Sequence, residues 1–363
     1  MRTDKNRRVT QLEGLRFIMC CIIILSHLEF LGELGLFGKI YNRFFHNATM
    51  AVDYFFILSG FGIYLSNKRP DSGLANNIKF AINKIKKIYP FYILSLIMGI
   101  VWIFLSMDDI NIKNILINTG YVLIDLSLLQ SLTGMIEVSH SVNGVCWFLS
   151  SIFICYMLCP IFLKIMNRIT NKIEAYRGII LTTSIIIILS IIASVIERFG
   201  SNYGINDIWY GHPFIRCWYL LIGMYCGWFY KNVERVFGEK EELSVVFVAV
   251  IYFLLRNSLL QLAGRNIMRV IDVLLCFFLI YIISQGDGIV SRFLKSKKIQ
   301  LLASMSMYLY IFHYPIRMIV ETVFIKYNIN FFIGNFSYII EVVLILMLTM
   351  AIVYFFQKRG AKC

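Results

Sequence analysis

Long uncharged apolar stretches constrain this chain more than any other feature. Gly178 to Val195 and Val342 to Phe356 run for about eighteen and fifteen residues without a charge, close to the ~20 residues that cross ~30 Å of hydrocarbon as a helix. Inside a bilayer only helices or closed barrels satisfy every backbone polar group, and these stretches lack the alternation of barrel strands. We therefore predict an all-α fold, a polytopic membrane helical bundle.

The apolar stretches divide the chain into about ten spans. Only 15% of the residues are charged, against roughly a quarter in an ordinary soluble domain. The first span follows a basic start but meets no small-residue cleavage site, so we interpret it as retained and not as a signal peptide. Residues 1–363 show no linker, low-complexity segment or repeat, which predicts a single transmembrane domain. The span centres are expected near Ile22, Phe56, Ser95, Phe153, Ile187, Leu221, Val250, Phe277, Leu309 and Leu346.

The positive charges fall mainly on one side of this arrangement. With a cytoplasmic N-terminus, 24 of the 35 Lys and Arg residues lie in inner segments and ten in outer ones, with Arg16 inside the first span. This split predicts that both termini are cytoplasmic, and it explains the basic charge without a nucleic-acid partner. The inner segments are the N-terminus, Lys68 to Lys87, Lys164 to Arg177, Lys231 to Glu242, Arg292 to Lys298 and the tail from Lys358.

One segment, Ile115 to Leu132, does not fit this count. It is apolar but carries Asn118, Asp125 and Gln130, and a full crossing here would move Lys164 to Arg177 to the outer side. We interpret it as a re-entrant or interfacial element on the outer side.

The first span contains two ionisable residues, Arg16 and His27, and such residues are costly inside a membrane. Eleven residues at ~100° each make three turns plus ~20°, so both side chains lie on one helix face, ~16 Å apart along the axis. Taken singly, Arg16 could be a snorkelling anchor and His27 a helix–helix hydrogen bond. Their common face favours one shared cavity, with the imidazole as general base and the guanidinium as an anion partner.

The second span begins with Asp53 and continues to Ser59 and a pair of glycines. Asp53 either orients His27, as the carboxylate of a His–carboxylate base, or caps the start of its own helix. The small residues favour close helix approach.

Other polar residues stand at the ends of later spans. Lys84 and Lys87 precede Tyr89 at the inner side, where they either fix topology beside anionic lipid or hold the phosphates of an acyl donor. His140 is interpreted as solvated and incidental. For His313 a structural hydrogen bond and a substrate contact are both open. Asn143 precedes Trp147 on the outer side.

Several classes of site are excluded by what the sequence lacks. The five histidines lie in different segments without HExxH or CxxC pairing, and there is no P-loop, GxGxxG or GxSxG motif. We expect no metal. The nine cysteines sit mostly in apolar stretches, without metal or disulfide spacing, and are interpreted as small core residues.

Taken together, these motifs resemble the acyltransferase-3 family of bacterial membrane O-acyltransferases. That family has a first-span Arg and His with ten residues between them, a GVDLFFVLSGF segment, an R-x-x-R-I-Y-P loop, a W-[FS]-L segment and a Y-x-x-Y-x-x-H-x-P-like segment. The corresponding residues here are Arg16 and His27, Ala51 to Phe61, Lys84 to Pro90, Trp147 to Leu149, and Tyr308 to Pro315.

This chain departs from the family pattern in two places. Lysines replace both arginines of the inner loop, so a bidentate phosphate contact becomes a point-charge contact. The acidic W-S-L-x-x-E-E version is absent, because Ile152 and Phe153 occupy its acidic positions.

The resemblance implies a multi-pass enzyme of the bacterial cytoplasmic membrane that moves an acyl group, above all acetyl, from acetyl-CoA or another acyl-CoA to a surface polysaccharide or lipid-linked glycan. Membrane lipids are its surroundings. It implies His27, Asp53 and Arg16 as catalytic residues, with transfer either direct or through an acyl-enzyme on His27. The donor would contact Arg16, Lys84, Lys87 and Tyr89, and the acceptor Trp147, Asn143, His313 and Ser59.

Two rival classes share this composition. A transporter or flippase of a lipid-linked sugar or acyl group would use the charged cavity for passage, but the inverted repeats that many transporters carry are not visible here. A receptor or scaffold predicts that Arg16 and His27 can be replaced without consequence for glycan chemistry.

Overall fold

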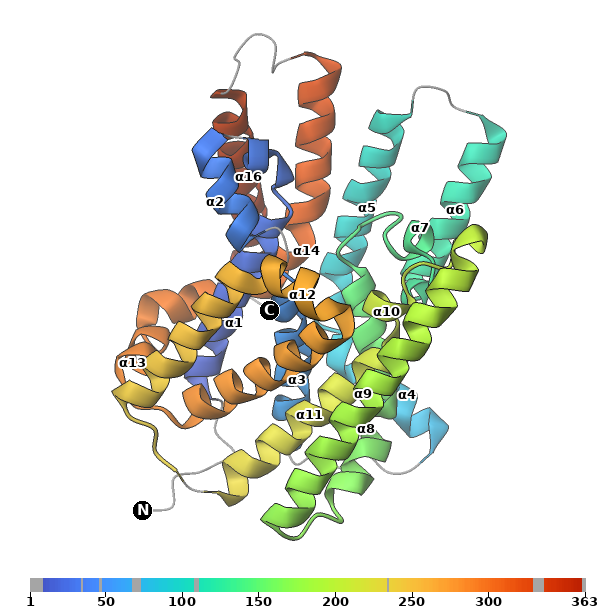
Figure 1. Ribbon diagram of the computed structural model, residues 1–363. Helices are drawn as coiled ribbons and strands as arrows, with labels where there is room; N and C mark the ends of the chain where they lie inside the picture. The colour runs from blue at the N-terminus through green and yellow to red at the C-terminus, as the bar shows by residue number, and fades with distance from the viewer. Residues whose placement is uncertain are drawn as a thin grey trace.

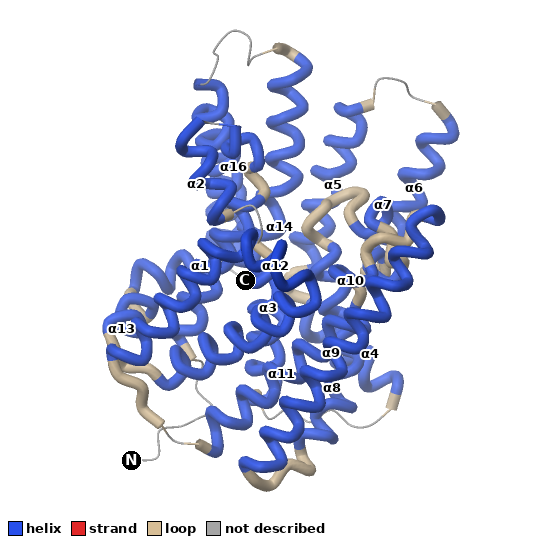
Figure 2. Tube along the Cα trace, viewed as in Figure 1, coloured by secondary structure: helices blue, strands red, loops and turns tan. Residues whose placement is uncertain are grey.

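In the computed structural model the described part of the chain is mainly helical, with short loops between the helices, as Figures 1 and 2 show. It comprises residues 9–33, 35–45, 48–66, 73–107, 111–233, 235–328 and 336–360. Within these ranges no strand forms, and only an isolated bridge joins Phe237 to Gly286. The prediction of an all-α membrane helical bundle is confirmed. Residues 1–8, 67–72 and 361–363, which belong to three of the predicted inner segments, lie outside the described residues.

The helices vary widely in length. The longest apolar ones form the body of the bundle, and short helices and 3-10 turns connect them (Figure 1). In chain order they are α1 (Thr10–Ser26), α2 (Gly35–Phe44), α3 (Thr49–Leu65), α4 (Leu74–Ile85), α5 (Tyr89–Ser106), α6 (Ile112–Leu126), α7 (Ile136–Ser139), α8 (Trp147–Met166), α9 (Lys172–Gly200), α10 (Ile208–Gly211), α11 (Pro213–Asn232), α12 (Glu239–Gln285), α13 (Ile289–Leu294), α14 (Lys297–Lys326) and α16 (Phe336–Gly360), with 3-10 turns at Glu29–Glu33, Gln130–Leu132 and Ser201–Tyr203.

Every predicted span centre lies inside one of these helices. Two of them, Val250 and Phe277, share α12, which bends sharply at Gly264 because that residue adopts a φ of +76°. Among the described residues, five helical segments are long and apolar enough to cross a membrane. They are Gly38–Leu65, which ends with α3, Tyr89–Ser106 (α5), Trp147–Met166 (α8), Lys172–Tyr203, which includes α9, and Glu239–Gln285 (α12). The number of ten crossings and the cytoplasmic position of both termini remain predictions.

The segment Ile115 to Leu132 forms most of α6 and the 3-10 turn after it. Helix α6 follows α5 in the chain and runs in the opposite direction (Figure 1). The backbone carbonyl of Asp125 accepts a hydrogen bond from Tyr92 Oη at 2.8 Å, and Gln130 Nε2 donates to the same hydroxyl at 3.2 Å. The second contact explains the polar side chain of Gln130 in an apolar segment, whereas the Asp125 carboxylate is buried with Oδ1 unpaired. Its re-entrant or interfacial position remains a prediction.

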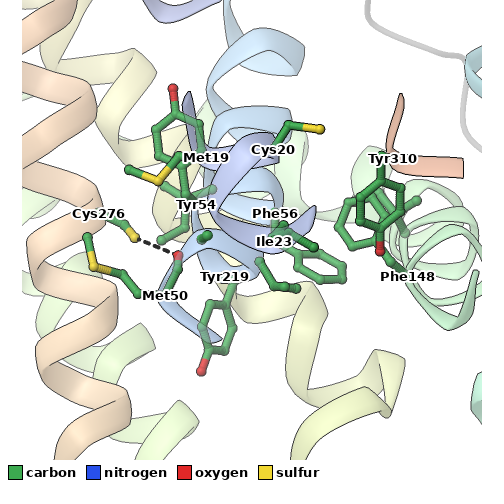
Figure 3. Packing of buried hydrophobic residues seen from close by; sticks show 14 of the residues in the cluster. Met19, Cys20, Ile23, Met50, Tyr54, Phe56, Phe148, Tyr219, Cys276 and Tyr310 are labelled. Carbon is green, nitrogen blue, oxygen red and sulfur yellow. Dashed lines mark hydrogen bonds between the residues drawn. The ribbon is translucent and has the colours of Figure 1, made fainter. Parts of the chain in front are cut away.

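Helix α3 is the centre of the bundle and packs most closely on α11. A Cβ on Gly60 would lie 1.8 Å from the Leu220 carbonyl oxygen, and one on Gly223 would lie 1.9 Å from that of Ile57. Only glycine allows the two backbones to approach this closely. The core around α3 includes Met50, Tyr54 and Phe56 beside α1, α11 and α12 (Figure 3).

The cysteines belong to this core. All eight in the described residues are unpaired, and the seven other than Cys21 are buried. In Figure 3 the Cys276 thiol donates to the Met50 carbonyl, at 3.4 Å. Cys363 lies outside the described residues. The interpretation of the cysteines as core residues is confirmed for these seven, whereas Cys21 is only partly buried.

Candidate active site

The contact between α1 and α14, called here the α1–α14 seam, holds both ionisable residues of the first span. Arg16 donates from Nε to Ser306 Oγ at 3.1 Å and from a terminal nitrogen to the Ala303 carbonyl at 2.9 Å. It also pairs with Glu13 on its own helix at 2.8 Å. His27 immediately follows the last turn of α1 and contacts α14 farther along. The predicted common face of Arg16 and His27 is therefore the face toward α14.

The imidazoles of His27 and His313 meet across this seam. His313 Nε2 lies 3.2 Å from His27 Nδ1, and His313 Nδ1 lies 3.1 Å from the Leu309 carbonyl oxygen. A carbonyl only accepts, so Nδ1 of a neutral His313 carries the proton and its Nε2 accepts from His27 Nδ1. The neutral His27 ring then has no proton on Nε2. The His27 residue as a whole is partly buried.

A cavity of about 480 Å³ opens at the Arg16 end of the seam and is called here the Arg16 cavity. Helices α1, α3, α4, α8 and α14 all contribute to its wall. It brings together three residues that the sequence singled out, Arg16, Ser59 and Lys84. The Ser59 hydroxyl donates to the Phe55 carbonyl of its own helix at 2.8 Å. The cavity thus combines cationic groups with a mainly apolar wall.

Two other predicted donor contacts lie elsewhere. Tyr89 is not part of the cavity wall, and its hydroxyl donates to the Leu126 carbonyl at 2.7 Å, which joins the start of α5 to the end of α6. Lys87 is exposed and also lies outside the wall. Of the four residues predicted to contact the acyl donor, Arg16 and Lys84 therefore line the cavity, and Lys87 and Tyr89 do not.

A packed group of side chains, called here the partition, closes the Arg16 cavity toward His27. Phe55, Phe148 and Met307 line both the cavity and a small void of about 10 Å³ beyond it. Tyr310 also lines this void. The ring centroids of Phe148 and Tyr310 lie 5.6 Å apart. Figure 3 shows both rings together with Ile23 of α1. The prediction of one cavity shared by Arg16 and His27 is wrong in this structure, because side chains from three other helices fill the space between them.

Asp53 does not orient His27. Its carboxylate forms an ion pair with Arg216 of α11, and both side chains are fully buried. The alternative prediction, a helix N-cap, is also wrong, because α3 begins at Thr49 and its N-cap is Ala48. The reason is rotational: residue 53 lies on the face of α3 that meets α11. His313, and not Asp53, is the residue that contacts the His27 ring.

The partner of Asp53 is enclosed by aromatic rings. The Arg216 guanidinium lies 4.9 to 5.7 Å from the ring centroids of Tyr210, Tyr219, Phe56 and Trp147. Its Nε donates to the Tyr210 carbonyl at 2.7 Å. This set of contacts stabilises a buried charge and leaves it no accessible surface.

Two predicted acceptor contacts, Trp147 and Asn143, are buried. Trp147 packs on Tyr210 with ring centroids 4.8 Å apart. Asn143 Nδ2 donates to Ser95 Oγ and to the Ile311 carbonyl, each at 3.1 Å. Both residues fix the loop before α8 against its neighbours.

Three of the ten basic residues that the charge count assigns to outer segments are buried arginines, Arg216, Arg256 and Arg269. The contacts of Arg216 are given above. Arg256 pairs with Asp272 at 2.8 Å across the bend of α12, and Tyr252 Oη donates to the same carboxylate at 2.6 Å. Arg269 donates to Ser190 Oγ at 3.0 Å and to the Trp209 carbonyl. The sequence contains an indication that these arginines are buried, because each lies within a largely apolar stretch.

Arg317 was also overlooked as a possible site residue. It follows His313 by one helical turn, pairs with Glu321 at 3.1 Å and lies within electrostatic reach of His27. It therefore places a cation near the two imidazoles. In the described residues no group of three or more His, Cys, Asp or Glu side chains gathers as a metal site would require.

Comparison with known proteins gives one match. The family model described as an acyltransferase domain, acyltransferase-3, matches residues 9–358, nearly the whole chain. No curated protein and no solved structure matches. The protein is therefore a membrane-helix protein that belongs to the acyltransferase-3 family.

Proposed function

We propose that this acyltransferase transfers an acetyl group from cytoplasmic acetyl-CoA to a hydroxyl of an extracytoplasmic polysaccharide or lipid-linked glycan, in the cytoplasmic membrane of a bacterium, with His27 as general base. The observation that carries this proposal is the bare Nε2 of His27, which results from the His313 contact. A neutral imidazole with an accessible lone pair is suited to take a proton from a hydroxyl.

The Arg16 cavity supports the donor side of the proposal. Arg16 and Lys84 supply positive charge for the phosphates of the donor, and the apolar wall suits its less polar arm. Because Arg16 is already held by Ser306 and the Ala303 carbonyl, its position needs little ordering when a substrate binds. The same contacts speak against a freely snorkelling side chain.

The proposed reaction forms one bond and breaks another. The glycan hydroxyl oxygen bonds to the acyl carbon, and the bond from that carbon to the thioester sulfur breaks. His27 Nε2 takes the hydroxyl proton and returns it to the departing thiolate, which leaves as a thiol. His313 Nε2 supports the step by accepting a hydrogen bond from the Nδ1–H group of His27, which stabilises the imidazolium that forms.

The partition determines what must move. For the acyl carbon to reach His27 from the Arg16 cavity, the side chains of Phe55, Phe148 and Met307 have to separate. We propose that donor binding shifts these side chains, so that the thioester passes Ile23 toward His27.

The test is acetyl transfer by purified protein reconstituted in vesicles, with radiolabelled acetyl-CoA and crude envelope glycan. His27→Ala is expected to lower labelling of the glycan by about 10²-fold to 10⁴-fold, the usual range for a general base. His212→Asn is the matched control, because His212 accepts from the Phe214 amide at the start of α11 and asparagine can keep that cap.

Three results would overturn the proposal. Wild-type labelling by His27→Ala would exclude His27 as the base. Glycan movement across the vesicle without label would instead support the transporter or flippase. Unchanged glycan chemistry on loss of both Arg16 and His27 would support a receptor or scaffold.

A further inference from the structure

A second histidine, His140, is held by a chain of two buried side chains. Ser139 Oγ lies 2.9 Å from His140 Nδ1 and 2.6 Å from Asp207 Oδ2. Ser139 and Asp207 are 1% and 3% exposed, whereas the His140 side chain is 28% exposed. The chain joins the end of α7 to the residue before α10, and the Gly134 carbonyl fixes the second segment by accepting from the Asp207 amide at 2.8 Å. His140 is not an incidental solvated residue.

The chemistry of this chain sets the direction of each hydrogen bond. A carboxylate only accepts, so the Ser139 hydroxyl donates to Asp207. Ser139 Oγ is then left as the acceptor for His140, and His140 Nδ1 carries the proton. In the neutral ring Nε2 has none. The arrangement gives His140 the same tautomer as His27, through different partners.

The position of His140 connects it with the candidate active site. Its ring lies 6.3 Å from that of Trp147. It also precedes the loop that holds Asn143, whose Nδ2 donates to the Ile311 carbonyl of α14, two residues before His313. Two imidazoles with bare Nε2 atoms thus lie at the same end of the α1–α14 seam, away from the Arg16 cavity.

We propose that His140 binds the acceptor glycan by accepting a hydrogen bond from one of its hydroxyls at Nε2, with Ser139 and Asp207 as positioning residues. The inference rests on the proposed function, because it assumes a hydroxyl-rich acceptor at the His27 end. A bare imidazole nitrogen needs a donor, and a sugar offers several hydroxyls. Holding one hydroxyl at His140 restricts which other hydroxyl reaches His27, so His140 contributes to the choice of acylated position.

The test uses two amides of different reach. In His140→Asn the amide nitrogen can still donate to Ser139, but nothing replaces Nε2. In His140→Gln the side-chain oxygen can accept near the position of Nε2. Initial rates of acetyl transfer from labelled acetyl-CoA are measured against increasing amounts of crude envelope glycan. His140→Asn is expected to raise the KM for glycan at least tenfold with a much smaller change in kcat, and His140→Gln is expected to restore much of the affinity.

Ser139→Ala provides a second variant that keeps the imidazole. Without Ser139 Oγ the ring loses its fixed tautomer, so we expect a smaller rise in the KM for glycan, of about threefold. Retained binding of acetyl-CoA, measured by calorimetry, shows that each variant is folded.

The possible results separate this inference from the proposed function. A wild-type KM for glycan in His140→Asn overturns the role of His140, even if His27→Ala is inactive. An equal loss in His140→Asn and His140→Gln that appears only in kcat also overturns it. If His27→Ala transfers acetyl normally while His140→Asn raises the KM, the role of His140 stands and His27 as the base does not.

Discussion

Two of the contacts between helices that bury polar side chains differ in what they leave available. At the contact between α3 and α11, called here the α3–α11 seam, Asp53 and Arg216 neutralise each other. One carboxylate oxygen and one guanidinium nitrogen of this pair lack a hydrogen bond, but both atoms are buried. At the α1–α14 seam, His27 and His313 are joined by one hydrogen bond, which leaves Nε2 of the neutral, partly buried His27 ring as an acceptor.

The comparison shows that a buried charge does not by itself mark a catalytic site. The cost of burying a charge makes every such residue a candidate, and by that measure Asp53 and His27 look alike. They differ in the atoms that remain after the protein has made its own contacts. The atoms of the ion pair that lack a hydrogen bond are buried among rings, whereas the two imidazoles leave one acceptor, Nε2 of the partly buried His27, unused.

Asp53→Ala tests this view of the α3–α11 seam and has the largest expected effect. It leaves the Arg216 charge buried without its partner, so the free energy of unfolding should fall by about 3–5 kcal/mol. Thermal unfolding of the purified protein in detergent measures the loss. The double variant Asp53→Leu with Arg216→Met should recover most of it, because no charge is left unpaired.

The comparison breaks if the result is reversed. An Asp53→Ala protein that unfolds like the wild type but no longer transfers acetyl would place Asp53 in the catalytic machinery. The α3–α11 seam would then be functional and not only structural.

His313→Phe tests the α1–α14 seam. Phenylalanine fills similar space but cannot accept from His27 Nδ1, so the tautomer of His27 is no longer fixed. Transfer should fall by about 100-fold, equivalent to about 2.7 kcal/mol, while thermal unfolding changes little. His313→Gln, which offers an oxygen near the position of Nε2, should retain more activity. If both variants unfold at much lower temperature than the wild type, the imidazole pair is a structural contact.

The sequence predicted much of the fold and only part of the site, for a physical reason. Apolar length and the helical repeat are local properties, so they located the helices and the common face of Arg16 and His27. Which face of α3 meets which helix is not local. Asp53 and Arg216 are 163 positions apart, and His27 and His313 are 286 apart, so their pairing depends on packing.

The same reason applies to the partition and to the lysines. A common helix face suggested a common cavity, but Phe148 of α8 and Met307 of α14 fill the space between Arg16 and His27. Spacing along the inner loop made Lys84 and Lys87 equivalent. The turn after α4 separates them, and only Lys84 lines the cavity.

Gly60→Ala tests the close approach of α3 to α11. Its new Cβ would lie 1.8 Å from the Leu220 carbonyl oxygen, so the helices must move apart, at a cost of about 1–3 kcal/mol in the free energy of unfolding. Gly62→Ala is the matched control on the same helix, because its Cβ would meet nothing within 4 Å among the described residues. Equal stability of the two variants would mean that the α3–α11 seam is not tightly packed in the membrane.

Lys84→Ala has the smallest expected effect and tests whether the Arg16 cavity, at one end of the α1–α14 seam, binds the acyl donor. Lys84 is exposed, so losing its point charge should raise the KM for acetyl-CoA only several-fold, about 1 kcal/mol, and less at high salt. Lys87→Ala should change that KM less, because Lys87 lies outside the Arg16 cavity. A larger effect at Lys87 would move the donor phosphates away from the cavity. Arg16 would then have to act on the thioester end of the donor, closer to the partition.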